Sequence, residues 1–278
     1  MDELMNMWRQ FFRVQHQESN WWERKKACFR RRHAKLKRVD VQGCMYEKQQ
    51  SGNTRTYDLN IVCHIEQGND HYTEEIQLPY QFDLVDGKIT NHMSIKQPRP
   101  EQAITVLKMP DATHRGNSFS YNRDRAIAYA NKWWNSYNPD YETFRVDCTN
   151  YVSQCLYAGG APMRGEPVRE NGWWYTAGNW SFSWSVAHSL RWYLMGSESG
   201  LTASELTNPE ELTPGDVICY DFASDGRWDH NTIVVAKDND NMPLVNAHTD
   251  NSKNRYWTYE DSLAWTEQTK YTFFRIGE

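Results

Sequence analysis

Apolar residues in the first part of the chain recur at helical spacing. Leu4, Met7, Trp8 and Phe11 recur at spacings of three and four residues. Such spacing places the side chains on one face of an amphipathic helix. The pattern therefore predicts one long helix or two helices between residues 2 and 37.

The next segment alternates between apolar and polar residues and is rich in β-forming side chains. Turn sequences such as Ser51-Gly52-Asn53 and Asp86-Gly87 interrupt the alternation. A period of two is typical of strands that bury one face. We expect an antiparallel meander with strands at Val39–Tyr46, Arg55–Glu66, Tyr72–Leu84 and Ile89–Ile95.

The second half of the chain combines helical and strand patterns. A helical pattern opens at Tyr121, and a second helix should start near Cys148 and end at the Gly159-Gly160 pair. Strand-like runs follow, and a short turn joins the last two, which indicates an antiparallel hairpin. These patterns predict an α+β fold. The strands are expected at Val217–Phe222, Asp229–Val235 and Pro243–His248.

Length and charge indicate two folding units. A chain of 278 residues is long for one domain and comfortable for two. Residues 1–117 carry a net charge of +3 and the rest of the chain carries −8, with the turn-rich stretch Pro110–Ser120 at the change. We therefore expect a helix-plus-meander module of unassigned role over residues 1–115 and a second domain over residues 116–278.

The composition indicates a core built largely from aromatic rings. Leu, Ile, Val and Phe together number 48, whereas Trp, Tyr and Phe number 39. Large rings bury enough apolar area to replace the missing aliphatic side chains. Three of them, Trp173, Trp174 and Trp184, could line a cleft on which a sugar or peptide stacks, or could simply fill the core.

Several classes of protein are not indicated. No stretch is long and apolar enough to cross a bilayer, and the mean hydropathy is −0.87. The first residues lack the apolar run of a secretory signal, so a cytoplasmic location with six reduced thiols is expected. Cys28, Cys44 and Cys63 lack the CxxC spacing of zinc sites, and we expect neither a metal nor another cofactor.

A basic run extends from Arg24 to Arg38, with nine Lys and Arg and no acidic residue. Such a run could bind nucleic acid or an anionic membrane surface. It could also form a solvated helix face or a contact between domains. We prefer the second interpretation and do not expect nucleic acid as a partner.

Cys148 is the candidate nucleophile. It lies in the predicted first turn of a helix, where unpaired N–H groups and the helix dipole stabilise an anion. We expect its thiol to be acidified, and the same amides could receive an oxyanion. Asp147 or Thr149 could cap the helix start. Cys155, seven residues further on, is expected to be a core thiol.

Two histidines of the predicted hairpin are candidates for the remaining catalytic roles. His230 and His248 should lie near the same end of the hairpin, over one helix N-terminus. Histidine is the natural general base at neutral pH, and we assign this role to His230. For the orienting third group we prefer His248, then Asn246 and then Asp250, because alternation puts Asn246 and His248 on one strand face.

A specific set of motifs runs from Tyr121 to the C-terminus. They are YNRDRAIAYANKWW, NPDY, DCTNYVSQCLYAGG, GWWY, SFSW, PGDVICYDF and the pair DHNTIVV and NAHT. With these motifs the chain resembles the bacterial putative amidase domain family, allied to NlpC-type and CHAP-type cysteine peptidases of papain-like fold. The resemblance implies a helix packed on an antiparallel sheet and a triad of Cys148, His230 and His248 that hydrolyses amide bonds in cell-wall-type peptides.

These observations predict a cysteine-dependent hydrolase that cleaves amide bonds of a peptide or muropeptide through a thioester. A cell-wall role would require release of the protein by a non-classical route. Two alternatives remain open at this stage. The domain could bind wall peptides or glycans with a vestigial triad, or it could use the same triad as an acyltransferase. The sequence assigns no oligomeric state.

Overall fold

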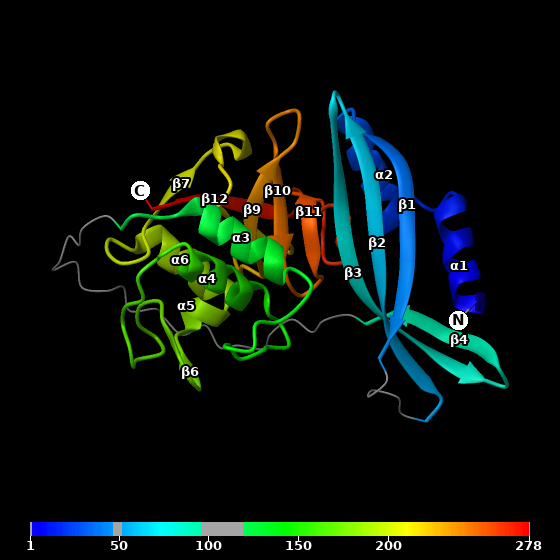
Figure 1. The fold of residues 1–278 in the computed structure, drawn as a ribbon, viewed down its shortest axis with the longest axis horizontal. Helices are drawn as coiled ribbons and strands as arrows, with labels where there is room; N and C mark the ends of the chain where they lie inside the picture. The colour runs from blue at the N-terminus through cyan, green and yellow to red at the C-terminus, as the bar shows by residue number, and fades with distance from the viewer. Residues whose placement is uncertain (1, 47–51, 96–118, 278) are drawn as a thin grey trace.

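Helices and antiparallel strands alternate along the chain, and the computed structural model describes residues 2–46, 52–95 and 119–277 (Figure 1). The fold is α+β, as predicted. Its N-terminal unit consists of α1 (Asp2–Arg13), α2 (Trp21–Arg31), β1 (Lys35–Met45), β2 (Thr54–Gln67), β3 (Asp70–Val85) and β4 (Lys88–Ser94).

The C-terminal unit begins with two longer helices and ends with strands. Its helices are α3 (Arg123–Trp133), α4 (Cys148–Ala158), α5 (Phe182–Ser185), α6 (Ala187–Gly196) and the 3-10 turn Pro209–Glu211. Its strands are β5 (Tyr175–Thr176), β6 (Asn179–Trp180), β7 (Ala203–Leu206), β8 (Val217–Asp221), β9 (His230–Lys237), β10 (Pro243–Ala247), β11 (Ser252–Tyr256) and β12 (Lys270–Ile276).

The predicted N-terminal helical region forms two helices. The side chain of Asn20 accepts a hydrogen bond of 2.9 Å from the N–H of Trp22 and so starts α2. The first strand begins at Lys35 and not at Val39, because Lys35 already pairs with Glu66 of β2. The remaining strands of the meander lie within a few residues of their predicted positions.

The sheet of the N-terminal unit buries one face against its helices. Every second residue of β2 from Tyr57 to Ile65 is at most 1% exposed. Trp8 of α1 packs on this face and donates a hydrogen bond of 2.8 Å to the Tyr57 hydroxyl. Alternation with a period of two therefore produced the expected buried face.

The sheet of the C-terminal unit is covered on both faces. Ile233 and Val235 of β9 pack with α3, α4 and α6 in one core, whereas Val234 packs in a second core on the opposite face. Figure 1 shows α3 in front of β9 and β10. None of the helices in the described part of the chain is long and apolar enough to cross a bilayer.

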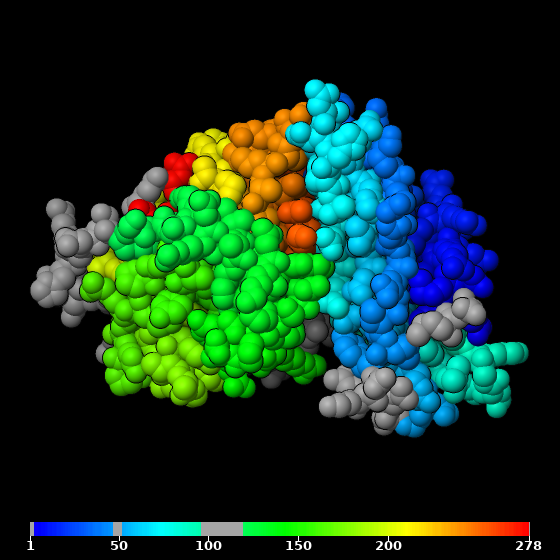
Figure 2. Space-filling view, viewed as in Figure 1, coloured from blue at the N-terminus to red at the C-terminus, as the bar shows by residue number. Residues whose placement is uncertain are grey.

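The two units share one sheet. In the described residues it has ten antiparallel strands in the order β1-β2-β3-β11-β10-β9-β8-β12-β7, with β4 beside β3. Ile76 and Glu75 of β3 pair with Ser252 and Lys253 of β11, and Figure 2 shows the cyan and orange segments side by side. The predicted boundary at Pro110–Ser120 lies largely outside the described residues, so the division into residues 1–115 and 116–278 stays a prediction.

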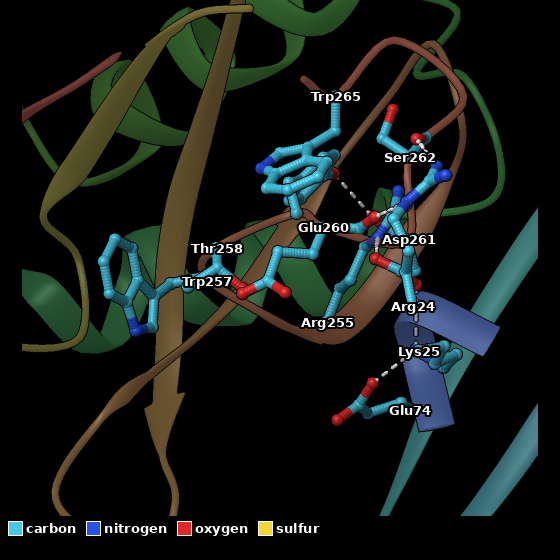
Figure 3. Close-up of polar contacts among 12 residues, drawn as sticks. Arg24, Lys25, Glu74, Arg255, Trp257, Thr258, Glu260, Asp261, Ser262 and Trp265 are labelled. Carbon is cyan, nitrogen blue, oxygen red and sulfur yellow. Dashed lines mark hydrogen bonds and ion pairs between the residues drawn. The ribbon is translucent and has the colours of Figure 1, made fainter. Parts of the chain in front are cut away.

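A buried cluster of charges reinforces the junction of β3 and β11 (Figure 3). The Nζ of Lys25 lies 2.7 Å from Glu74 Oε2 and 2.9 Å from Asp261 Oδ2. The Nε of Arg255 lies 2.9 Å from Asp261 Oδ1. Arg24 donates to the carbonyl oxygen of Glu260 and, at 2.8 Å, to that of Ser262. Part of the basic run is thus a contact between the two units.

The pKa of Asp261 reflects this environment. Burial alone would raise the pKa of the carboxyl group, but the charges of Arg255 and Lys25 outweigh it and hold the pKa well below the ordinary value. Asp261 is therefore ionised at neutral pH. Removing a cation from this cluster would leave buried negative charge without full compensation, which is strongly unfavourable.

We expect Lys25→Met to lower the free energy of unfolding by about 3 kcal/mol, because it breaks a buried ion pair. The measurement is denaturant unfolding followed by Trp fluorescence. Lys26→Met is the matched control, since Lys26 lies on the same helix and its side chain is 29% exposed. An effect of Lys25→Met no larger than that of the control would contradict a stabilising role for the buried cluster.

Candidate active site

Cys148 is the first residue of α4, as predicted, and the helix ends at Ala158 before the glycine pair. The first main-chain hydrogen bond of the helix runs from Tyr151 N to Asp147 O at 2.9 Å. Asp147 therefore occupies the N-cap position. The local sequence signals for the start and end of this helix are confirmed.

The side chain of Asp147 does not cap the helix. Its Oδ1 accepts hydrogen bonds from Phe144 N at 3.0 Å and from Asn150 Nδ2 at 2.9 Å, and its Oδ2 lies 2.7 Å from His248 Nδ1. The hydroxyl of Thr249 accepts from the N–H groups of Asp147 and Cys148, at 3.1 and 3.2 Å. Asp147 is thus the N-cap residue by position, but the expected capping hydrogen bond from its side chain is absent. Thr149 does not cap the helix either, because its hydroxyl donates to Asn231.

The thiol of Cys148 is buried, and only 1% of the residue is exposed. Burial raises the pKa of this thiol, while hydrogen bonds from the main chain of Asn231 and from the side chains of Thr149 and Thr249 act in the opposite direction. The expectation of an acidified thiol is therefore wrong in this structure. Desolvation of the charged form outweighs the favourable helix start.

Asn231 connects β9 to the start of α4 and was not among the predicted site residues. Its Oδ1 accepts a hydrogen bond of 2.8 Å from the Thr149 hydroxyl, and its Nδ2 lies 3.0 Å from the sulfur of Cys219. The main chain of Asn231 also meets the sulfur of Cys148. The sulfur of Cys148 thus lies next to Asn231 near the beginning of β9, and Asn231 directly follows His230 in that strand. The position of Asn231 directly after His230 was the available signal.

The ring of His230 lies on the other face of β9. His230 pairs with Tyr220 across the sheet, and its ring centroid is 5.6 Å from that of Tyr220 and 5.0 Å from that of Tyr259. Burial lowers the pKa of His230 to about 3, and the charge of Arg255 adds to this effect. The Nε2 atom has no hydrogen-bond partner among the described residues. The structure therefore places a neutral imidazole close to β9's start, without a hydrogen bond to Cys148.

His248 contacts residues at or near the start of α4 and does not contact His230 through either ring nitrogen. Its Nδ1 faces Asp147 Oδ2, and its Nε2 lies 2.7 Å from the carbonyl oxygen of Trp133. Both ring nitrogens are therefore engaged by partners at or near the start of α4. The ring also stacks on Tyr151 of α4, with centroids 4.1 Å apart. No nitrogen of His248 is left to orient His230.

The other candidate orienting groups lie near His248. Asn246 faces α4 as well, because it pairs with Ile233 of the helix-facing core. Its amide donates to Asn131 Oδ1 at 3.1 Å, and its Oδ1 accepts from Asn254 N at 2.9 Å. Asn246 therefore has structural partners. Burial raises the pKa of Asp250, and the charge of Arg255 acts in the opposite direction.

The three tryptophans proposed to bind substrate are core residues. Trp173 and Trp184 are 0% exposed and Trp174 is 1% exposed. The indole of Trp173 donates to Ser153 Oγ at 3.0 Å, and that of Trp184 donates to Asn150 Oδ1 at 2.8 Å. Stacking of a substrate on these rings is therefore excluded in this structure. The alternative interpretation, that they fill a core short of aliphatic side chains, describes their position.

Comparisons with known proteins identify the family. A family model described as a putative amidase domain matches residues 120–274, which is more than half of the chain. The protein therefore belongs to this amidase-domain family.

Within the described residues, no group of three or more His, Cys, Asp or Glu side chains could hold a metal ion.

Two relatives come from Bacillus subtilis (strain 168), and both are uncharacterized. The chain is 58% identical to YhbB over 161 residues, which cover 58% of this chain and 52% of YhbB. It is 31% identical to YjcM over 144 residues, which cover 48% of this chain and 32% of YjcM. The chain thus spans about half the length of the first relative and about a third of the second. No solved structure matches the chain.

The burial of His230 predicts a pH dependence of stability. The pKa is about 3 in the folded chain and about 6.5 in an unfolded one, so between these values the unfolded state binds more protons. Stability should fall as the pH drops from 6.5, by up to about 1.4 kcal/mol per pH unit from this residue. Above pH 6.5 the residue should contribute no pH dependence.

We expect His230→Asn to reduce this slope between pH 6.5 and 5, measured by denaturant unfolding at several pH values. His71→Asn is the control, because the side chain of His71 is 71% exposed. An unchanged slope in His230→Asn would mean that His230 is not held neutral by the fold.

Proposed function

We propose that the protein is a cysteine-dependent amide hydrolase with Cys148 as the nucleophile. The observation that carries the proposal is the position of its sulfur at the start of α4, against the first residues of β9. Membership of an amidase-domain family supports the reaction class. We also propose that residues 116–278 form the catalytic domain and are allied to papain-like peptidases of the NlpC and CHAP types.

In this proposal His230 is the general base. Its buried Nε2 has no hydrogen-bond partner among the described residues, so this nitrogen can accept a proton. Burial lowers the pKa of the ring to about 3, so the movement that opens the site also has to relieve this burial before the ring can act as a base at neutral pH. His248 has a different role from the one expected for a triad member. Together with Asp147 it holds the start of α4 against the end of β10, and it acts on Cys148 only through that position.

The proposed reaction has two stages. The Cys148 thiol gives its proton to His230, the sulfur attacks the amide carbonyl, and His230 returns the proton to the departing amine. Water, deprotonated by His230, then attacks the thioester, and the sulfur leaves and regains a proton. Because Cys148 is only 1% exposed, the residues that cover the sulfur have to move before an amide can reach it.

The substrates that we propose are peptide amides of the cell-wall type. The support is the resemblance carried by the DCTNYVSQCL, PGD and DH motifs. A peptide amide also matches the reaction class of the family. Transfer of the acyl group to an amine in place of water would use the same first stage, and product analysis distinguishes the two outcomes.

One observation favours a second candidate, a binding module with a vestigial triad. Cys148 is buried and makes no hydrogen bond to His230 among the described residues. That candidate needs exposed aromatic rings on which a ligand can stack, however, and Trp173, Trp174 and Trp184 lie in the core. The hydrolase therefore explains more of the site.

We expect Cys148→Ala to abolish amide cleavage, with a loss of at least about 10³-fold, because it removes the atom that forms the thioester. The assay is mass spectrometry of products from purified muropeptides incubated with each variant. Cys44→Ala is the control, since Cys44 is an exposed thiol in the N-terminal unit. Product formation by Cys148→Ala would exclude this nucleophile, and absence of product with the wild type would favour the binding module.

The two histidines should respond differently to substitution. His230→Asn should lower kcat by about 10²- to 10⁴-fold, because it removes the proton acceptor. His248→Asn should lower the melting temperature and reduce activity less, because it loosens the start of α4. Activity and thermal unfolding are measured on both variants. A His230→Asn variant with wild-type kcat would refute the assignment of the base.

A further inference from the structure

Thr249 has an unusual backbone for its residue type. It follows β10 and His248, and its φ angle is +86°. Positive φ is unfavourable for a β-branched side chain. Thr249 is the only β-branched residue with positive φ in the ranges that the structure describes, whereas Asn, Asp and Ser account for most of the other non-glycine residues with positive φ. Such strain persists only where surrounding contacts impose it.

The hydroxyl of Thr249 is engaged at the start of α4. Its oxygen accepts from Asp147 N at 3.1 Å and from Cys148 N at 3.2 Å, so both of its lone pairs are used. Its own proton remains available to be donated. The sulfur of Cys148 is a candidate acceptor, because Thr249 already binds the N–H of the same residue. A hydrogen bond from this side chain acts to lower the pKa of the Cys148 thiol.

The N-terminal unit holds the turn that contains Thr249. Gln77 of β3 donates its N–H to the carbonyl oxygen of Asn251 at 2.8 Å. The amide of Asn251 donates in return to Gln77 Oε1 at 2.9 Å. The next residue, Ser252, pairs with Ile76 in the sheet. Strand β3 therefore fixes the chain two residues after Thr249.

We propose that Thr249 is a positioning residue that orients the Cys148 sulfur and donates a hydrogen bond to its thiolate, and that β3 of the N-terminal unit keeps Thr249 in place. This inference rests on the proposed function of Cys148. It assigns a task to the N-terminal unit, which would complete the active site without touching the substrate. A helix cap alone would need only an acceptor oxygen, whereas a hydroxyl group also carries a proton that it can donate to the sulfur.

Other titratable groups surround the thiol and have to be held constant in the test. Asp147 directly precedes α4, Cys219 lies on β8, His230 on β9 and His248 directly after β10. The negative charge of Asp147 raises the pKa of Cys148. The test therefore changes Thr249 and leaves these four residues unaltered.

The experiment measures alkylation of Cys148 by iodoacetamide against pH, with peptide mass spectrometry as the readout. Thr249→Val keeps the shape of the side chain and removes the hydroxyl. We expect it to shift the midpoint of the profile upward by about one pH unit, or about tenfold slower alkylation below the midpoint. Thr249→Ser should restore the wild-type midpoint.

Thr249→Gly guards against misfolding of the Val variant, since Gly accepts positive φ without strain. It should keep or raise the melting temperature and still shift the midpoint upward. Wild-type midpoints in folded Thr249→Val and Thr249→Gly would overturn the proposal. Gln77→Ala should shift the midpoint in the same direction by less, whereas Gln81→Ala, on the same strand, should not; no shift in Gln77→Ala would overturn the role of β3.

These results are separable from the proposed hydrolysis, because alkylation requires no turnover. If Cys148→Ala retained activity while the Thr249 variants still shifted the midpoint, hydrolysis by Cys148 would be wrong and the contact with Thr249 would stand. If the midpoints did not move while Cys148→Ala was inactive, the nucleophile would stand and the role of Thr249 would be wrong.

Discussion

The carboxylate of Asp147 joins the start of α4 to the end of β10. It binds His248 with one oxygen and holds the first turn of the helix with the other. Because His248 and Thr249 are consecutive, this contact also brings the Thr249 hydroxyl to the first N–H groups of the helix. This arrangement, together with the hydrogen bond from the Thr149 hydroxyl to Asn231 of β9, sets the position of Cys148 relative to the sheet.

The two faces of β9 separate the groups that an amidase would use. Asn231 faces α4 and meets Cys148, whereas His230 faces the aromatic core formed with Tyr220 and Tyr259. Alternation of side chains along a strand makes this separation unavoidable for adjacent residues. Cys148 lies on the α4 side with Asn231, so a proton transfer to His230 requires the ring and the sulfur to approach each other.

The N-terminal unit is joined to the rest by hydrogen bonds and by buried charge. The pairing of β3 with β11 continues one sheet through both units, and Lys25 bridges Glu74 and Asp261 beside it. Buried ion pairs contribute little net stability compared with apolar packing, but they penalise any arrangement in which one partner is missing. They are therefore well suited to define how two units with separate cores meet.

The sequence by itself determined the α+β class, the helix that begins at Cys148 and the motifs of the amidase-domain family, because periodicity and helix ends are local properties. Tertiary structure decided which partner each polar side chain takes. Spacing alone could not show that His248 binds Asp147, that Thr249 replaces Asp147 as the helix cap, or that burial raises the pKa of the thiol. Trp173 is a further example, because the sequence around a tryptophan does not distinguish a ring that lines a cleft from a ring that is buried in the core. Register between distant strands and exclusion of water decide these matters, and both arise only when the units pack.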